Sequence, residues 1–371
     1  MLKDRLESDL SALHSIIRQL LGDASAKVRL LKEEKLQRSY VYRLTWEIND
    51  AIRSLVVKRF SLERSFIEQQ AIKRWLVLTS LAHVAPTLLG VAPEKEGQFV
   101  WHVYEDLGDC VLEHDETAYS SAAPNDRGFL TPLRISPDRD HIKVIILLIS
   151  ALHEKFLAHT LLGECRQQGS DLGSHFLYAN VHDAICALES LPTVKIAFSK
   201  KQINVRDRLL DKLYRLRTEL PWRINLLEKL GGAPTLLHGD LSVKNAFVFQ
   251  TKQGLSGKLI DWDHVGVGPV SYDLSTLLMQ FPIKDRIWML NLYQHVRGNN
   301  NNPWPTYEEW NVLFETNEYA RLANSVIWAA IAATEEQSLW AFDELEKIGT
   351  WFEKLNPVLP TADGINVSGN C

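Results

Sequence analysis

Three residues between positions 238 and 261 have the types and spacing that phosphoryl transfer requires. Asp240 belongs to a His-Gly-Asp sequence, Asn245 follows it by five positions, and Asp261 comes after a short strand pair. Phosphoryl transfer needs a carboxylate that orients the attacking hydroxyl and accepts its proton, and it needs oxygen ligands for Mg²⁺ nearby. A loop that carries Asp240 and Asn245, beside a hairpin that ends at Asp261, could supply all three groups.

These motifs resemble a known family. The segments HGDLSVKN and LIDWDHVGVGPVSYDLSTLL are similar to those of the aminoglycoside phosphotransferase and choline kinase superfamily, whose members share a protein-kinase-like fold. The resemblance implies that Asp240 is the catalytic base and that Asn245 and Asp261 bind Mg²⁺. It also implies that Asp273 is a structural brace for the catalytic loop. Asp263 lies where the family often has another acid, and it could support the metal site.

The neighbours of Asp240 have less specific roles. The place of His238 in the motif predicts that it scaffolds the loop through hydrogen bonds and does not transfer protons. A turn-forming role is the alternative for Asp240, and a cap or turn role is the alternative for Asn245. The two motifs in order favour the chemical roles. Ser242 stands where protein kinases usually have a lysine, which favours a small molecule over a protein as the phosphate acceptor.

The first part of the chain must hold the nucleotide. Apolar residues recur at helical spacing near the N-terminus, and larger residues alternate from Tyr40 to Trp46 in the manner of a strand. Asn49-Asp50 is typical of a turn. The predicted elements are a helix over 2–21, strands over 40–46, 54–58 and 98–104, and a helix over 62–81. Such an order predicts a small antiparallel sheet that carries one helix.

Lys58 ends a predicted strand, where a kinase fold needs a cation for the ATP phosphates. The alternative is an exposed lysine at a strand end without a function. The motif around Asp240 later in the chain favours the role in binding the ATP phosphates. The acidic partner of Lys58 is expected on the next helix. Glu68 matches the family's position best, and Glu63 is the alternative.

The segment from Val103 to Leu107 is the predicted hinge, in which backbone donors and acceptors of Tyr104, Glu105 and Asp106 would meet the nucleotide base. No glycine precedes the Tyr40 strand in EEKLQRSY, although many kinases have a glycine-rich phosphate cover there. Ser39 and its neighbours could bind the phosphates through backbone N–H groups instead.

The second part of the chain is predicted to be mainly helical. Residues 142–160 are apolar on almost every face, as in a central helix, and further helices are expected over 203–230 and 306–355. The fold class is therefore α+β, with a protein-kinase-like bilobal fold of a small antiparallel-sheet lobe and a larger helical lobe. The expected domains are 1–105 for the nucleotide, 106–356 for catalysis and acceptor binding, and 357–371 as a flexible tail.

Composition limits the partners. The net charge of −5 comes without blocks of like charge, so neither nucleic-acid binding nor membrane anchoring is expected. No secretory signal is visible and the four cysteines are scattered, which favours the cytoplasm. From residue 301 onward eleven acids stand against three bases. These acids could attract a cationic acceptor, although solvated helix faces explain most of them more simply.

The predicted function is an ATP- and Mg²⁺-dependent small-molecule kinase that transfers the γ-phosphoryl group to a hydroxyl of an aminoglycoside-, choline- or sugar-like acceptor. One alternative is a catalytically silent nucleotide-binding module that acts through a partner. A protein kinase is a further alternative, and Ser242 argues against it.

Overall fold

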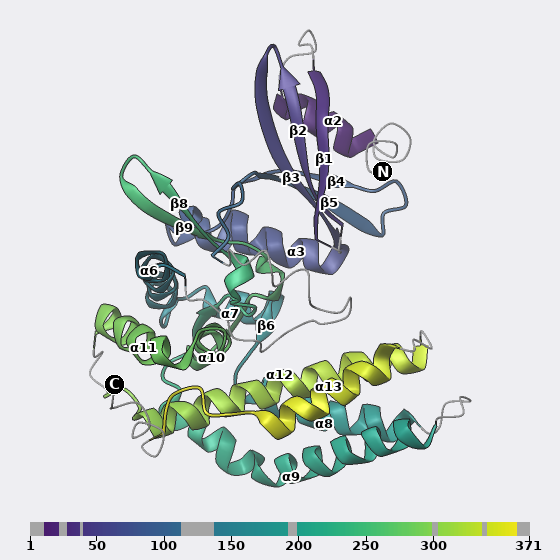
Figure 1. The fold of residues 1–371 in the computed structure, drawn as a ribbon, viewed down its shortest axis with the longest axis vertical. Helices are drawn as coiled ribbons and strands as arrows, with labels where there is room; N and C mark the ends of the chain where they lie inside the picture. The colour runs from purple at the N-terminus through teal and green to yellow at the C-terminus, as the bar shows by residue number, and fades with distance from the viewer. Residues whose placement is uncertain are drawn as a thin grey trace, which may run out of the picture. The chain divides into compact units, whose positions relative to one another are not determined.

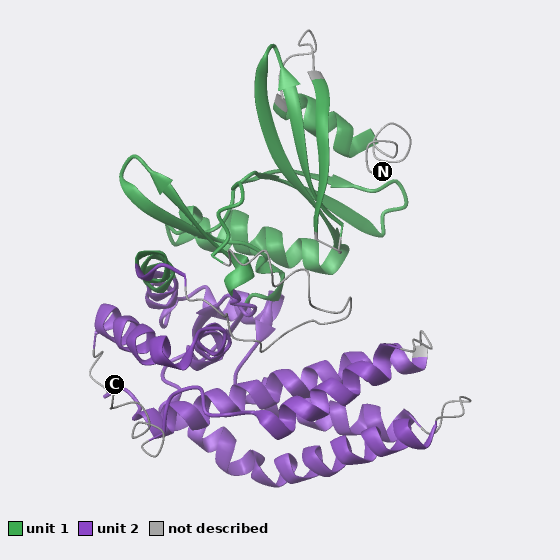
Figure 2. Cartoon of the chain, in the orientation of Figure 1, with its two compact units in different colours: residues 1–114, 140–148, 243–265 green, residues 115–139, 149–242, 266–371 purple. Residues whose placement is uncertain are grey.

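The computed structural model describes residues 11–21, 28–37, 40–112, 137–191, 199–298, 303–335 and 340–361. The chain divides into two compact units (Figure 2). Unit 1 comprises residues 1–114, 140–148 and 243–265, and unit 2 comprises residues 115–139, 149–242 and 266–371. Neither unit is continuous in sequence.

Unit 1 contains an antiparallel sheet of five strands in the order β1-β2-β3-β5-β4 (Figure 1). Its strands are β1 (Val28–Gln37), β2 (Val41–Ile48), β3 (Ala51–Ser61), β4 (Leu88–Pro93) and β5 (Phe99–Glu105). Asn49 and Asp50 both have positive φ, 48° and 67°, between the paired residues Ile48 and Ala51. Two such residues form the tight hairpin turn that matches strand twist, so the predicted turn aligns β2 with β3.

One face of the sheet is closed by helix α2 (Ser11–Leu21). Leu13 and Ile17 are fully buried and share a core with Trp46, Val57 and Trp101 of the strands. Their spacing of four residues places them on one side of the helix. The remaining buried members of this core are Leu44, Ile48, Leu55, Ala92 and Val103.

The rest of unit 1 carries the polar residues of interest. Helix α3 (Leu62–Gln70) follows β3 directly and continues through a π-helical turn (Ala71–Trp75) and α4 (Leu76–Leu78), and a 3₁₀ turn (Ala82–Val84) comes next. The hairpin β8 (Ala246–Thr251) and β9 (Gly254–Leu259) comes from much later in the chain. Its Phe247 pairs with Val111 in an antiparallel bridge, and a Cβ added at Gly257 would lie 2.9 Å from Val144 Cγ1. This close packing explains why residues 243–265 belong to unit 1.

Unit 2 is mainly helical. Its helices are α7 (Leu162–Gln168), α8 (Ser174–Ser190), α9 (Lys200–Leu230), α10 (Ser271–Met279), α11 (Ile283–Arg297), α12 (Tyr307–Glu335) and α13 (Trp340–Lys354). Helix α6 (Arg139–Phe156) has residues in both units. A short sheet, β6 (Ser170–Asp171), β10 (Gly266–Gly268) and β7 (Thr235–Leu237), holds the segment before Asp240. None of the described helices is long and apolar enough to cross a bilayer.

The structure differs from the sequence predictions at several elements. The segment EEKLQ, expected as a loop, lies within β1, and β4 was not predicted. Strand β1 is an edge strand whose charged residues conceal the usual apolar alternation. The helix expected over 62–81 ends at Leu78 and includes the π-helical turn. The helical stretch predicted over 306–355 contains two helices, α12 and α13. Ser39, residues 1–10 of the predicted N-terminal helix and residues 362–371 of the predicted tail lie outside the described residues.

The domain limits also differ. The predicted boundary at residue 105 assigns all later residues to the second part of the chain, whereas the hairpin with Asn245 and Asp261 belongs to unit 1. The start of the predicted tail is anchored, because Val358 and Leu359 are buried. Arg286 donates to Val358 O at 2.9 Å, and Asn311 both donates to and accepts from the Leu359 backbone. Residues 357–359 are therefore part of unit 2.

Candidate functional site

The open end of the β8–β9 hairpin brings two predicted metal ligands together. Ala246 pairs with Leu259 at that end, Asn245 immediately precedes β8, and Asp261 follows β9 by two residues. The backbone N–H of Ile260 donates to Asn245 O at 2.9 Å. The hairpin register thus places Asn245 and Asp261 on adjoining backbone segments.

A strained turn directs the two aspartates after β9. Asp261 has φ 70° and ψ 59°, the left-handed conformation that costs most residues about 1 kcal/mol. A 3₁₀ turn from Trp262 to His264 follows, and Trp262 is completely buried with its indole N–H bonded to Leu259 O at 2.8 Å. The buried indole holds the turn in place, and Asp263 is buried on it.

Lys58 and Glu68 join these aspartates. Lys58 lies on β3, and its Nζ donates to Asp261 Oδ1. Oxygen atoms of Glu68, Asp261 and Asp263 lie within 4.8 Å of one another. Lys58 forms its direct ion pair with Asp261, and the negative charge of Glu68 helps to raise the pKa of Lys58. Glu63, the alternative partner, is exposed in the first turn of α3, whereas Glu68 is buried.

The charges of this cluster are unbalanced. Three carboxyl groups face Lys58 and Arg64, whose Nη1 lies 3.2 Å from Asp263 Oδ2. Burial raises the pKa of Glu68 to about 8 against the attraction of Lys58. Burial and the charge of Asp261 raise the pKa of Asp263. Burial would raise the pKa of Asp261 as well, but the Lys58 charge and hydrogen bond lower it to about 2.

The donor set fits a hard divalent cation. Glu68 Oε2 and Asp263 Oδ1 are buried and have no hydrogen-bond partner among the described residues. Carboxylate oxygens are the ligands that Mg²⁺ takes in proteins, and a cation there would offset the excess negative charge. The sequence predicted Asp261 for this role with Asn245, while Glu68 was expected only as the partner of Lys58.

The side chains of the predicted hinge are all engaged within unit 1. The Tyr104 hydroxyl donates to Glu68 Oε1 at 2.9 Å. Glu105 accepts from the Thr87 backbone and hydroxyl and from Lys258. Asp106 accepts from the Gly108 N–H at 2.9 Å and pairs with Arg43 at 2.9 Å. A nucleotide base at this segment would therefore meet backbone groups.

The loop that carries Asp240 lies in unit 2 and begins at β7. Gly239 has φ 84°, which suits glycine, and the Ser242 N–H donates to Asp240 O at 2.9 Å. Asp273 of α10 accepts from the backbone N–H groups of His238 and Gly239, at 2.8 and 3.0 Å. Both carboxylate oxygens of Asp273 thus fix the two residues before Asp240.

Sequence reasoning missed His153. This buried residue of α6 contacts Asp273 Oδ2 through Nε2 at 3.3 Å, and its Nδ1 contacts the Tyr293 hydroxyl at 2.8 Å. Burial lowers the pKa of His153 despite Asp273. Burial would raise the pKa of Asp273, but the hydrogen bond and charge of His153 lower it. The available signal was a histidine directly after the uncharged run of residues 144–152.

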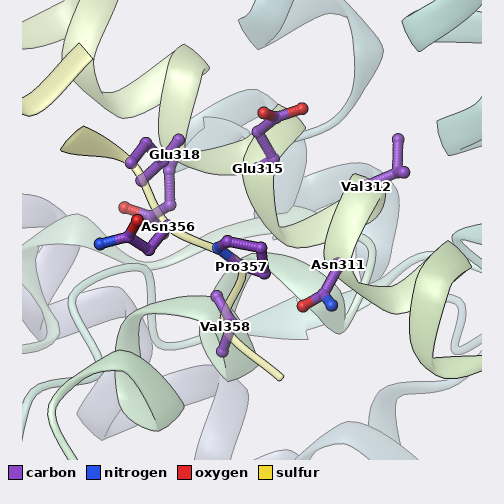
Figure 3. A pocket seen from close by; sticks show the side chains of 8 residues that line it. Asn311, Val312, Glu315, Glu318, Asn356, Pro357 and Val358 are labelled. Carbon is purple, nitrogen blue, oxygen red and sulfur yellow. The ribbon is translucent and has the colours of Figure 1, made fainter. Parts of the chain in front are cut away.

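A cavity of about 190 Å³ lies in unit 2 between α12 and the segment after α13 (Figure 3). Glu315 and Glu318 line it, together with Asn311, Val312 and residues 355–358. Glu315 is bonded to Arg223 at 3.0 Å, and Glu318 is paired with Arg321. Each of the two acids thus has an arginine partner in the same unit, and Arg223 is shared with Glu219.

Part of the chain matches a known protein family. Residues 161–313 match the sequence model of the phosphotransferase enzyme family. No curated protein gives a significant match. The ethanolamine kinase of Plasmodium vivax is similar in structure, with a TM-score of 0.53 and 13% identity over 89% of this chain and 82% of that one. The macrolide 2′-phosphotransferase of Brachybacterium faecium has a TM-score of 0.51 and 15% identity over 91% and 97% of the two chains.

These structural similarities confirm the predicted fold class, an α+β kinase-like fold with an antiparallel sheet and a mainly helical remainder. The family match covers the segment that carries Asp240, Asn245, Asp261 and Asp273. The comparisons therefore show a kinase-like fold for the chain and a match of residues 161–313 to the phosphotransferase enzyme family.

Proposed function

We propose that this protein transfers the γ-phosphoryl group of ATP to a hydroxyl group of a small molecule, with Mg²⁺ as the cofactor. The observation that carries the proposal is the cluster of Lys58, Glu68 and Asp261 in unit 1. Lys58 and Asp261 are 203 residues apart in sequence. One basic and several acidic side chains that converge from a strand, a helix and a hairpin match what a magnesium triphosphate requires.

The residues of unit 1 would bind the nucleotide. Asp261 and Asn245 would hold the metal, with Asp263 beside them, and Lys58 would bind the α- and β-phosphates. When bound, Mg²⁺ would neutralise the charge that develops on the phosphate oxygens. Release of Lys58 from Asp261 is part of this proposal, because the same ammonium group cannot fully serve both partners.

Asp240 would act on the acceptor. Its carboxylate would orient the attacking hydroxyl and take the proton, while the oxygen bonds to the γ-phosphorus and ADP leaves. Two features support this role. Asp273 fixes the backbone before Asp240. The chain between Asp240 and Asn245 is only five residues long, so it limits their Cα separation to roughly 17 Å.

Three observations concern the class of the phosphate acceptor. Ser242 in place of the lysine of protein kinases favours a small molecule. The similar structures act, by their names, on ethanolamine and on a macrolide. The pairing of Glu315 and Glu318 with arginines argues against these two acids as a site for a cationic acceptor. We therefore propose a small hydroxyl compound without assigning it a positive charge.

Substitution of Asp240 tests the assignment. The variant Asp240→Asn is expected to bind MgADP within about twofold of wild type, because Asp240 is assigned to the acceptor hydroxyl and not to the metal or the ADP phosphates, and to lose at least 100-fold in kcat. The assay is ADP formation with a panel of amino alcohols, sugars and antibiotics. Asp207→Asn, at an exposed position of α9, is the matched control. Unchanged kcat in Asp240→Asn would refute the role, and wild-type MgADP binding without turnover on the panel would favour the silent module.

A further inference from the structure

A continuous chain of hydrogen bonds lies behind Glu68. Gln69 Nε2 donates to Ser65 Oγ at 3.1 Å, and Ser65 Oγ lies 2.7 Å from His102 Nε2. His102 Nδ1 lies 2.9 Å from the Tyr104 hydroxyl, which donates to Glu68 Oε1 at 2.9 Å. All of these residues belong to unit 1, and Ser65, Glu68, His102 and Tyr104 are each at most 6% exposed.

The direction of every bond in this chain can be deduced. A hydroxyl has one proton, and Tyr104 gives its proton to Glu68. Tyr104 must therefore accept from His102 Nδ1. A neutral imidazole with a proton on Nδ1 accepts at Nε2, so Ser65 donates to it. The Ser65 oxygen is then free to accept from Gln69, as observed.

The surroundings keep His102 neutral. It lies on β5 opposite Lys58 of β3, and its ring packs at 4.6 Å from the Phe60 ring. Burial, together with the charges of Lys73 and Lys58, lowers the pKa of His102 to about 3. The neutral form is the one that can both donate and accept, so His102 passes on the direction that the bond from Tyr104 to Glu68 sets.

The chain connects two elements. Ser65 and Glu68 are three residues apart on α3, on the same side of that helix. Both are bonded to alternate residues of β5, His102 and Tyr104, which point to the same face of the sheet. Two attachment points one turn apart fix the rotation of α3 about its own axis.

We propose that Ser65, His102 and Tyr104 are positioning residues that set the orientation of the Glu68 carboxyl group toward Lys58 and the metal. They hold Oε1 through the Tyr104 hydroxyl, and Oε2, which has no hydrogen-bond partner in the described part of the chain, stays available. This inference rests on the proposed function. It assigns a task to the Tyr104 side chain, whereas the predicted contact with the nucleotide base involves the backbone of the hinge.

The test uses the full-length protein and removes one proton donor. In Tyr104→Phe the hydroxyl is lost with almost no change in volume. A hydrogen bond to an ionised or buried carboxyl group corresponds to about tenfold in an equilibrium constant. We expect the Kd for MgADP, measured by calorimetry, to rise about tenfold, and amide hydrogen exchange in α3 of the nucleotide-free protein to become faster. The KM for the acceptor should stay within about twofold. Tyr214→Phe, which removes the exposed hydroxyl bonded to Glu189, is the control.

A pair of His102 variants provides an independent readout. In His102→Asn the amide nitrogen can replace Nδ1 as donor to Tyr104, whereas His102→Leu cannot donate. His102→Asn should bind MgADP more tightly than His102→Leu. If the Tyr104→Phe variant does not fold, this comparison tests the inference in its place. Equal MgADP affinity in wild type and Tyr104→Phe, or equal affinity in the two His102 variants, would overturn the inference. Wild type that binds MgADP without turnover would refute the proposed function alone, and wild type that does not bind MgADP would refute both.

Discussion

Acidification should destabilise the protein through His102. The folded-state pKa of this residue is about 3, against an ordinary value of 6.5, because burial penalises the charged imidazole. Below about pH 6.5 the unfolded chain binds a proton at this position and the folded chain does not. Proton uptake therefore favours unfolding. The contribution is fully present above pH 6.5, declines as the pH falls and is exhausted near the folded-state pKa.

The size of the effect follows from the two pKa values. One pKa unit corresponds to about 1.4 kcal/mol, so a protein at about pH 5 loses about 2 kcal/mol of unfolding free energy from His102 alone. The limit at still lower pH is about 5 kcal/mol. A loss of 2 kcal/mol is large against the 5–15 kcal/mol, roughly, that stabilise ordinary domains.

Urea denaturation followed by tryptophan fluorescence and circular dichroism measures this contribution. The unfolding free energy of wild type is compared at about pH 8 and about pH 5 with that of His102→Asn, which does not titrate in this range. The pH-induced loss should be about 2 kcal/mol smaller in the variant. His182→Asn, at an exposed position of α8, should behave like wild type. Identical losses in wild type and His102→Asn would show that His102 is not buried as a neutral group.

Two further predictions concern unit 2. Asp273→Asn places an amide N–H₂ against the backbone N–H of His238 or Gly239. We expect a loss of about 3 kcal/mol in unfolding free energy, and a fall in kcat with little change in MgADP affinity. Stability and kcat equal to wild type, measured in a urea titration and an ADP assay, would contradict the bracing role. Burial raises the pKa of the Cys165 thiol to about 12, whereas Cys186 is exposed. Iodoacetamide should therefore modify Cys186 in the native protein and reach Cys165 only after denaturation, and equal labelling in peptide mass spectra would refute this.

The fold and the identities of the main polar residues could be predicted from sequence because they depend on local signals. Turn residues Asn49-Asp50 mark the hairpin, and the spacing of Asp240, Asn245 and Asp261 is the basis of the proposed chemistry. These signals lie within short windows. Strand β1 escaped prediction because it is an edge strand rich in charge, so its pattern resembles that of a loop.

The contacts of the site could not be predicted in the same way. The pairing of Lys58 with Asp261, the bond from Tyr104 to Glu68 and the position of His153 beside Asp273 all depend on tertiary packing between distant segments. A sequence shows that a tyrosine is present on a strand, but the side of the strand that carries Glu68 depends on the register of β3 and β5. The discontinuous units follow from packing around Gly257, which no local pattern encodes.

The discontinuity of unit 1 has a consequence for synthesis of the chain. Its sheet is complete by residue 105, but the hairpin that carries Asp261 emerges from the ribosome only after more than a hundred further residues. Closing so long a loop is slow. During translation the face of α3 around Glu68 therefore stays exposed until the hairpin has been synthesised, and nascent chains with such exposed surfaces are bound by chaperones.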